Sequence, residues 1–291
     1  MLPKEILKKI RRIEITTSKL VTDFLSGEYE SVFKGRGIEF DEVREYQPGD
    51  EIRSIDWNVT ARTGHPYVKK YVEERQLTVM ILLDASGSSF FGTAKRLKSE
   101  LAAEVSAVLA FAAIQNKDRV GLIIFTDRIE KFIPPRKGRA HVLRVIREAL
   151  CFKPKGKLTD IELALKYLDG VTARRVVAFI ISDFFAKNFK KSLSISSKRH
   201  DVIAVTITDP REEALPNVGM VELADAETGA LYLIDTSSAS LRNKYASGAH
   251  TLIEERRRLF DSASVDHIDI LTSKPYIEEF IKFFSRRKKR L

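Results

Sequence analysis

A carboxylate and two hydroxyl side chains alternate directly after an apolar run in the stretch LTVMILLDASGSS, residues 77–89. Asp84 ends the run, and Ser86 and Ser88 follow at every second position. A curved loop with this spacing can turn all three side chains toward one point. Their oxygen atoms are the ligands that hard cations such as Mg²⁺ prefer in proteins. The stretch therefore predicts a loop that can bind a divalent cation at the end of a buried strand.

Two further oxygen-bearing residues are expected at the same edge of the sheet. Asp183 ends the apolar run RRVVAFIISD, and Thr159 precedes the helical pattern in GKLTDIELALKYL. In a parallel α/β sheet, ligands bind in the crevice beyond the carboxyl ends of the strands. The structural alternative makes Ser86 and Thr159 helix N-caps and Asp183 a loop aspartate. Their order and placement together favour a metal site, whose expected ligands are Asp84, Ser86, Ser88, Thr159 and Asp183.

Short apolar runs rich in β-branched residues alternate with helical patterns from about residue 77 onward. Strands that are apolar at nearly every position must be covered on both faces, which is typical of a mainly parallel sheet. The sequence thus predicts an α/β fold, a mainly parallel sheet with helices on both faces. Strands are expected over 77–84, 120–126, 175–183, 201–208, 219–224, 231–235 and 267–271. Helices are expected over 94–115, 140–152, 160–169, 187–198, 238–263 and 275–287.

The first 76 residues have a different pattern. A basic amphipathic helix is expected over 4–15, followed by turn signals in KGRG and QPGDE and by alternating segments such as RSIDWNVTAR. Two parts are therefore predicted, an N-terminal helix with a small β-rich subdomain over 1–76 and an α/β domain over 77–291. Ile52, Ile55 and Trp57 are expected to pack inside the smaller part, with Trp57 as its anchor.

The predicted site resembles the metal-ion-dependent adhesion site (MIDAS) of von Willebrand factor A domains. The resemblance is carried by DASGSS, by the threonine of KLTD and by the aspartate of ISD. The upstream stretch GRGIEFDEVREYQPGDEIRSIDWNVTARTG resembles the signature of DUF58, a bacterial family of proteins of unknown function whose members carry such a domain. The resemblance extends over about residues 35–209 and is weaker beyond.

This resemblance implies a Rossmann-like, doubly wound sheet of the von Willebrand factor A type. It also implies a bound Mg²⁺, or Mn²⁺ or Ca²⁺, with one coordination position left for an acidic side chain of a protein partner. Neutral hydroxyl ligands leave most of the charge of a cation uncompensated, so an incoming carboxylate gains a strong electrostatic contact. Because family members are often encoded beside MoxR-type AAA+ ATPases, the resemblance also implies a non-enzymatic adaptor or chaperone partner of such an ATPase.

A metal-dependent hydrolase or phosphatase is the alternative function, because strand-end aspartates also organise phosphoryl transfer. A phosphatase of the haloacid dehalogenase type needs a second aspartate two residues after the first, and that position is Ser86 here. No histidine or lysine is placed as an obvious general base either. The net charge of +10 is compatible with acidic partners. The sequence has no recognised nucleic-acid-reading motif, so no specific nucleic acid is expected as a partner.

The expected location is the cytoplasm. Cys151 is the only cysteine, which excludes an internal disulfide and fits a reducing compartment. The N-terminus has no apolar signal region, and the longest apolar runs are far shorter than the roughly 20 residues that cross a bilayer. The basic helix over 4–15 and the segment SRRKKR permit weak peripheral contact with an anionic membrane at its inner face.

Four other residues near the predicted site have competing interpretations. Asp127 is expected in a turn, and Asp160 is expected at a helix start, where it complements the helix dipole. Phe90 and Phe91 are expected to pack under the hydroxyl loop. The alternatives are a position of Asp127 near the same edge of the sheet, a contact from Asp160 to the water ligands of the metal, and a partner surface rimmed by the two phenylalanines.

Overall fold

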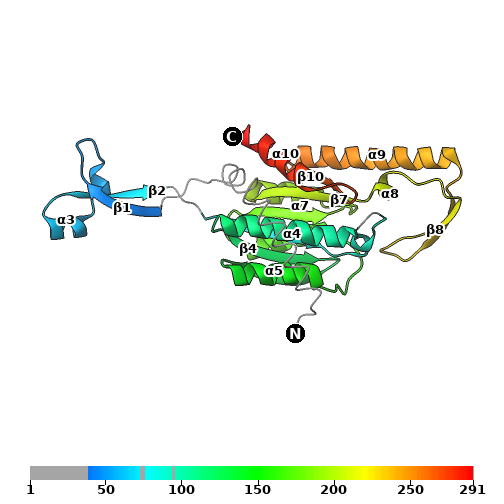
Figure 1. Cartoon of the computed structure of the whole chain (residues 1–291), viewed down its shortest axis with the longest axis horizontal. Coiled ribbons are helices and arrows are strands. Elements are labelled where there is room, and N and C mark those ends of the chain that lie inside the picture. The colour runs from blue at the N-terminus through cyan, green and yellow to red at the C-terminus, as the bar shows by residue number, and fades with distance from the viewer. Residues whose placement is uncertain (1–38, 73–75, 94–95, 291) are drawn as a thin grey trace.

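Six strands form the central sheet, in the order β10-β7-β6-β3-β4-β5 (Figure 1). The computed structural model describes residues 39–72, 76–93 and 96–290 of the chain. Neighbouring strands are parallel across β3 (Thr78–Asp84), β4 (Arg119–Phe125), β6 (Val177–Ser182), β7 (Asp201–Thr208) and β10 (Asp266–Leu271). The edge strand β5 (Ile129–Arg136) pairs antiparallel with β4. The predicted mainly parallel sheet is confirmed.

The edge strand β5 has no counterpart among the strands expected from the sequence. It is only partly buried, and it contains Pro134 and Pro135, which lack the backbone N–H that a central strand needs. Such a strand is tolerated at a sheet edge, where its apolar pattern is too weak to detect from sequence.

Helices cover both faces of the sheet, and the side chains of β3 alternate between them. Val79, Ile81 and Leu83 belong to the core under α4 (Lys98–Gln115), α5 (Arg139–Cys151) and α10 (Ile277–Lys288). Met80 and Leu82 belong to the core under α6 (Ile161–Val171), α7 (Lys190–Arg199) and α9 (Ala239–Ser262). Burial on both sides explains why β3 is apolar at every position before Asp84, and it confirms the predicted doubly wound arrangement.

The connections from β3 place two strand ends side by side. The chain passes from β3 through α4 to β4 on one side, and later enters β6 on the other side of β3. The order of strands therefore reverses between β3 and β6, which makes their carboxyl ends a topological switch point where α/β sheets bind ligands. Asp84 ends β3, and Asp183 directly follows β6.

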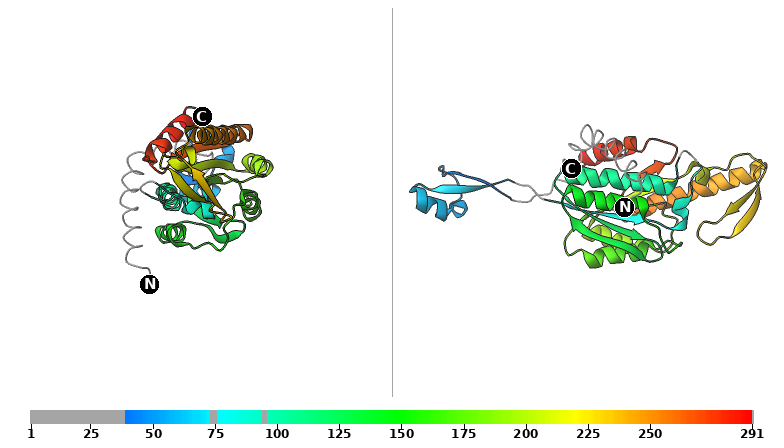
Figure 2. Two further views of the ribbon diagram at one scale, coloured as in Figure 1. Left: turned by 90° about the vertical axis from the view of Figure 1, so that its right-hand side faces the viewer. Right: turned by 60° about the horizontal axis from the view of Figure 1, so that its bottom comes forward.

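The strands expected over 219–224 and 231–235 form a separate hairpin and do not join the central sheet. β8 (Met220–Ala224) pairs antiparallel with β9 (Leu231–Asp235). The hairpin lies between the short helix α8 (Pro210–Glu213) and α9 and extends beyond the sheet (Figures 1 and 2). In the described part of the chain, β8 and β9 pair only with each other.

A two-stranded antiparallel arm precedes the central domain in the chain. It consists of β1 (Glu39–Glu45) and β2 (Tyr67–Val72), with the short helices η2 (Ile52–Ser54) and α3 (Trp57–Thr63) between them (Figure 1). The segment RSIDWNVTAR thus forms helices and not an alternating strand, because the carboxylate of Asp56 accepts hydrogen bonds from the N–H groups that begin α3. The helix expected over 4–15 lies outside the described residues.

The expected packing role of Trp57 is wrong. Its side chain is 66% exposed, and Ile52 is 67% exposed, whereas Ile55 is half-buried. The described elements of the arm are too few to enclose a large aromatic side chain.

None of the helices in the described part of the chain has the length and apolar character needed to span a membrane.

Candidate functional site

Asp84 is buried at the end of β3, and both of its carboxylate oxygens accept hydrogen bonds. Oδ1 accepts from the backbone N–H of Ser86 at 2.9 Å, and Oδ2 accepts from the hydroxyl of Ser182 at 2.6 Å. Ser182 is the last residue of β6 and in turn accepts from the N–H of Phe184 at 3.0 Å. The carboxylate is thus oriented by both strands that border the switch point.

The hydroxyls of Ser86 and Ser88 lie together in the loop after β3. Their Oγ atoms are 3.2 Å apart, and Ser86 is fully buried. Ser86 occupies the N-cap position of η3 (Gly87–Phe90), but its hydroxyl makes no capping hydrogen bond. The N-cap interpretation of Ser86 therefore does not explain its side chain, which remains available as an oxygen donor next to Asp84.

Asp183 forms an ion pair that the sequence did not predict. Its Oδ2 lies 2.8 Å from Nζ of Lys98, and the same Nζ lies 2.5 Å from Oε1 of Glu212. Lys98 and Asp183 are both buried. Arg256 donates to the main-chain oxygen of Asp183 at 3.0 Å. The clue in the sequence was Lys98, the only lysine of α4, but nothing local identified its partners.

The charges of this cluster perturb one another. Burial, and next the negative charge of Asp183, raise the pKa of Asp84 to about 6. Burial alone would lower the pKa of Lys98, but Asp183 and Glu212 raise it above its usual value. Burial raises the pKa of Glu212, and Lys98 opposes this effect. Asp84 is therefore a buried carboxylate whose charge is poorly compensated, whereas Lys98 is held as an ammonium.

Three of the five predicted ligands line one small cavity. Asp84, Ser88 and Asp183 surround a space of about 10 Å³, together with Lys98. This volume approaches that of a single water molecule, so the space suits one small ion or water and no larger group. The oxygen donors fit a hard cation, with the Lys98 ammonium as a competitor for Asp183. In the described part of the chain, no three His, Cys, Asp or Glu side chains are grouped for metal binding, so the serine hydroxyls would have to contribute.

Thr159 lies in the adjoining loop and does not line this cavity. The loop is joined to the serine loop by a hydrogen bond from the N–H of Gly87 to the carbonyl of Lys157 at 2.8 Å. The hydroxyl of Thr159 donates to Oε1 of Glu227 at 2.7 Å. Thr159 is not a helix N-cap, because Asp160 takes that role for α6. The structure thus brings Asp84, Ser86, Ser88 and Asp183 together and places Thr159 beside them, bonded to a carboxylate of the β8–β9 hairpin.

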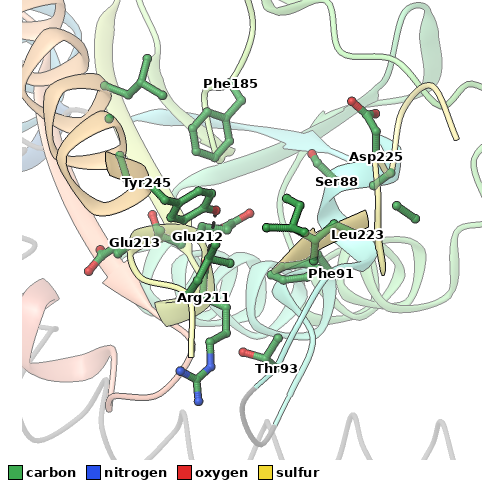
Figure 3. Close-up of a pocket in the computed structure, with 18 of the residues that line it drawn as sticks. Ser88, Phe91, Thr93, Phe185, Arg211, Glu212, Glu213, Leu223, Asp225 and Tyr245 are labelled. Carbon is green, nitrogen blue, oxygen red and sulfur yellow. Dashed lines mark hydrogen bonds between the residues drawn. The ribbon is translucent and has the colours of Figure 1, made fainter. Parts of the chain in front are cut away.

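A much larger groove adjoins the site. It encloses about 1010 Å³ between the hairpin, α8 and α9, and Ser88 lines both this groove and the small cavity. In the view of Figure 3, Tyr245 of α9 lies on the left of the groove and Ser88 on the right. Most of the lining is apolar, with Arg211, Lys244 and Arg256 among its charged residues. The candidate metal position therefore adjoins a largely apolar groove through Ser88.

The remaining expectations near the site have mixed outcomes. Asp127 lies in the turn between β4 and β5, as expected, and pairs with Arg128 at 3.1 Å. Asp160 caps α6 through a hydrogen bond from Leu163, which confirms its position at the helix start. The expected packing of Phe90 is wrong, because its side chain is 51% exposed, and Phe91 is 37% exposed and lines the groove.

Comparison with known proteins shows that the chain matches one protein family. The model of the family described as "Protein of unknown function DUF58" matches residues 42–255. The uncharacterized protein Rv1480 of Mycobacterium tuberculosis is 32% identical over 283 residues, covering 96% of this chain and 89% of that protein. The uncharacterized protein YeaD of Bacillus subtilis is 26% identical over 105 residues, covering 36% of this chain and 24% of that protein.

Two solved structures are also similar. One is the conserved hypothetical protein BatB from Bacteroides thetaiotaomicron, with a TM-score of 0.46 and 15% identity, covering 73% of this chain and 99% of that chain. The other is the SpRpn10 VWA domain, with a TM-score of 0.39 and 11% identity, covering 71% of this chain and 94% of that chain.

Proposed function

The chain belongs to the DUF58 family, and from that membership and the geometry of the strand-end site we propose a divalent-metal-dependent protein-interaction module. In this proposal Asp84, Ser86, Ser88 and Asp183 hold Mg²⁺, or Mn²⁺ or Ca²⁺, with Thr159 at the side of the site. The bound cation would supply positive charge that attracts a carboxylate of the partner. The observation that carries the proposal is the small cavity shared by Asp84, Ser88 and Asp183 at the switch point of the sheet.

The roles of the protein groups follow from their contacts. Ser182 and the N–H of Ser86 orient the carboxylate of Asp84. The ammonium of Lys98 compensates the charge of the Asp183 carboxylate. The site therefore attracts a cation mainly through the carboxylate of Asp84. The apolar groove beside Ser88 excludes water from part of a docked segment, which strengthens an ionic contact made there.

Metal binding is the first test. Titration calorimetry with Mg²⁺, Mn²⁺ and Ca²⁺ on the full chain should show one site, and Asp84→Asn should abolish it. Asp127→Asn is the matched control, because Asp127 also follows a strand of the same sheet but bonds to Thr126 and Arg128. Absence of binding by the wild type at millimolar metal would refute the proposal.

The partner is the second part of the proposal. The resemblance to DUF58 proteins supports an adaptor or chaperone function with a MoxR-type AAA+ ATPase. Affinity capture from native extract, with Mg²⁺ or with a chelator, should recover such an ATPase with the wild type and not with Asp84→Asn. Recovery that is independent of both metal and Asp84 would separate the ATPase from this site.

A hydrolase that uses the same aspartates is the competing function. Lys98 is the basic side chain that contacts the carboxylate of Asp183, and its raised pKa keeps it protonated, so it cannot act as a general base at neutral pH. This contact favours the binding module. Turnover of phosphoesters or peptides that disappears in Asp84→Asn would reverse the ranking.

The proposed location is the cytoplasm, with weak peripheral contact at an anionic membrane surface. The basic C-terminal segment contributes less charge to such contact than its sequence implies, because Arg287 and Arg290 both pair with Asp266. Co-sedimentation with anionic and neutral vesicles at low salt tests the contact, and equal recovery with both would rule it out.

A further inference from the structure

We propose that Glu227, at the tip of the β8–β9 hairpin, is a tethered acidic ligand. Its carboxylate occupies the position that an acidic side chain of a partner takes when the partner binds. The partner would then be a segment that carries a carboxylate next to apolar side chains, and its binding would displace the hairpin tip. This inference rests on the proposed function, because it concerns access to the same site.

The position of Glu227 is the first support. Its Oε1 accepts a hydrogen bond from Thr159 at 2.7 Å, across 68 residues of sequence. Thr159 is one of the two predicted ligands that do not line the small cavity, and its bond to Glu227 means that the side of the site facing the hairpin already contacts a carboxylate. Glu227 is half-buried there, although it belongs to the turn of a protruding hairpin.

The turn itself is built to present this side chain. The carboxylate of Asp225 accepts hydrogen bonds from the N–H groups of Glu227 and Thr228, at 2.9 and 2.8 Å. Gly229 closes the turn with a φ of +74°, a left-handed conformation that favours glycine. These bonds fix the backbone before Glu227 reaches Thr159, which lowers the entropy cost of the contact.

The tip also sits tightly on the serine loop. A Cβ atom at position 87 would collide with the main-chain oxygen of Ala226, so this approach requires Gly87. Gly87 also donates its N–H to Lys157 in the loop that carries Thr159. One glycine between two predicted metal ligands therefore contacts both the hairpin tip and the Thr159 loop.

The hairpin is attached in a way that permits displacement. Its base is closed by hydrogen bonds between Thr236 and Gly219, and Arg242 of α9 donates to Thr236 at 2.7 Å. The groove of about 1010 Å³ lies between these attachments and the tip (Figure 3). A movement at the base could lift the tip without breaking any strand pair of the central sheet.

The groove indicates the chemistry of the segment that would replace Glu227. The apolar lining of the groove comes from two elements. The hairpin contributes Val221, Leu223 and Ile234, and α9 contributes Leu252 and Ile253. The charged lining has both signs, because Arg211, Lys244 and Arg256 are accompanied by Glu212, Glu213, Asp225 and Glu227. The groove therefore favours apolar side chains, and the carboxylate of the segment follows from the contact that Glu227 makes with Thr159.

The test uses a peptide with the sequence of the hairpin tip as the probe. A labelled peptide of residues 223–230 (LADAETGA) is titrated in Mg²⁺ against the wild type, Glu227→Gln and the control Glu222→Gln, an exposed carboxylate of β8. A tethered ligand has an effective concentration of about millimolar, so Glu227→Gln should bind the peptide at least tenfold more tightly than either other protein. The same peptide with Gln at the position of Glu227 should bind none of them. Equal peptide affinity for wild type and Glu227→Gln, including no binding to either, overturns the inference.

A second measurement separates this inference from the proposed function. Hydrogen exchange at residues 225–230 should slow on addition of Mg²⁺ in the wild type and in Glu222→Gln, but not in Glu227→Gln. A merely structural hydrogen bond to Thr159 would give exchange that does not respond to Mg²⁺. If Mg²⁺ binds the wild type while exchange stays unchanged, only the tethered ligand is refuted. If calorimetry detects no Mg²⁺ binding, the proposed function itself is refuted, and the tethered ligand with it.

Discussion

Nζ of Lys98, at the start of α4, lies 2.8 Å from Oδ2 of Asp183, in the loop after β6. Both side chains are buried, and Glu212 lies on the other side of the ammonium at 2.5 Å. The candidate metal site thus contains a cation of its own. This contact balances part of the acidic charge and leaves Asp84 as the poorly compensated carboxylate.

Removing this internal cation should destabilise the protein in a way that metal can correct. Lys98→Met leaves the buried Asp183 and the half-buried Glu212 without their ion pair, which should lower the free energy of unfolding by about 3–5 kcal/mol. Millimolar Mg²⁺ should restore more stability to this variant than it adds to the wild type, because the competitor for Asp183 is gone. Urea unfolding with and without Mg²⁺ measures both effects.

The matched control for this experiment is Lys198→Met, an exposed lysine near the end of α7. Its unfolding free energy should stay within about 0.5 kcal/mol of the wild type. A Lys98→Met protein as stable as this control would mean that the buried ion pair contributes no net stability.

Asp84 should stabilise the metal-free protein at low pH and destabilise it at neutral pH. Its pKa is raised from 3.8 to about 6, so the folded state binds the proton more tightly than the unfolded state. The resulting stability is fully present below pH 3.8 and is lost as the pH rises through about 6. In chelator at pH 7.5, Asp84→Asn should therefore be more stable than the wild type by about 1–3 kcal/mol.

Urea unfolding at pH 5 and pH 7.5 measures this difference, with Asp127→Asn as the reference for loss of a half-buried strand-end carboxylate. The advantage of Asp84→Asn should shrink at pH 5. A variant that is less stable than the wild type at pH 7.5 would show that the hydrogen bonds from Ser182 and Ser86 outweigh the cost of the buried charge.

The contact between Gly87 and the hairpin tip predicts opposite effects for two glycine-to-alanine changes. Gly87→Ala should displace Ala226 and destabilise the protein by about 1–3 kcal/mol, because the added methyl group meets main-chain atoms. Gly170→Ala in α6 has open space around its Cβ and should stabilise by up to about 1 kcal/mol. Thermal unfolding compares the pair. Equal effects would mean that the tip does not rest on the serine loop in solution.

His200 provides a pH response away from the site. It is buried after α7, its Nε2 lies 3.0 Å from Asp169, and burial lowers its pKa despite that carboxylate. The unfolded state therefore binds the proton first, and stability should fall as the pH decreases through 6.5. The difference in unfolding free energy between the wild type and His200→Gln, measured from pH 7.5 to 5, isolates this effect from that of Asp84. A difference that does not change with pH would contradict it.

Much of the architecture was predictable from local pattern. Seven expected strands and six expected helices occur close to their predicted positions, because burial on two faces imposes an apolar run and burial on one face imposes helical periodicity. The same patterns located Asp84 and Asp183 at strand ends, and the parallel order of β3 and β6 brought them together. The predicted burial of Trp57 was wrong. An aromatic residue in an alternating segment indicates burial only where enough structure surrounds it.

The sequence by itself determined where the strands of this protein end and which oxygen-bearing side chains follow them, since both depend on neighbours only a few residues away. The tertiary structure alone decided that Lys98 meets Asp183 and that Glu227 meets Thr159, pairs separated by 85 and 68 residues. It also decided that β8 and β9 leave the sheet and form a hairpin over the groove. These contacts depend on how α4 and the hairpin pack against the strand ends, and packing over such separations leaves no local periodicity in the sequence.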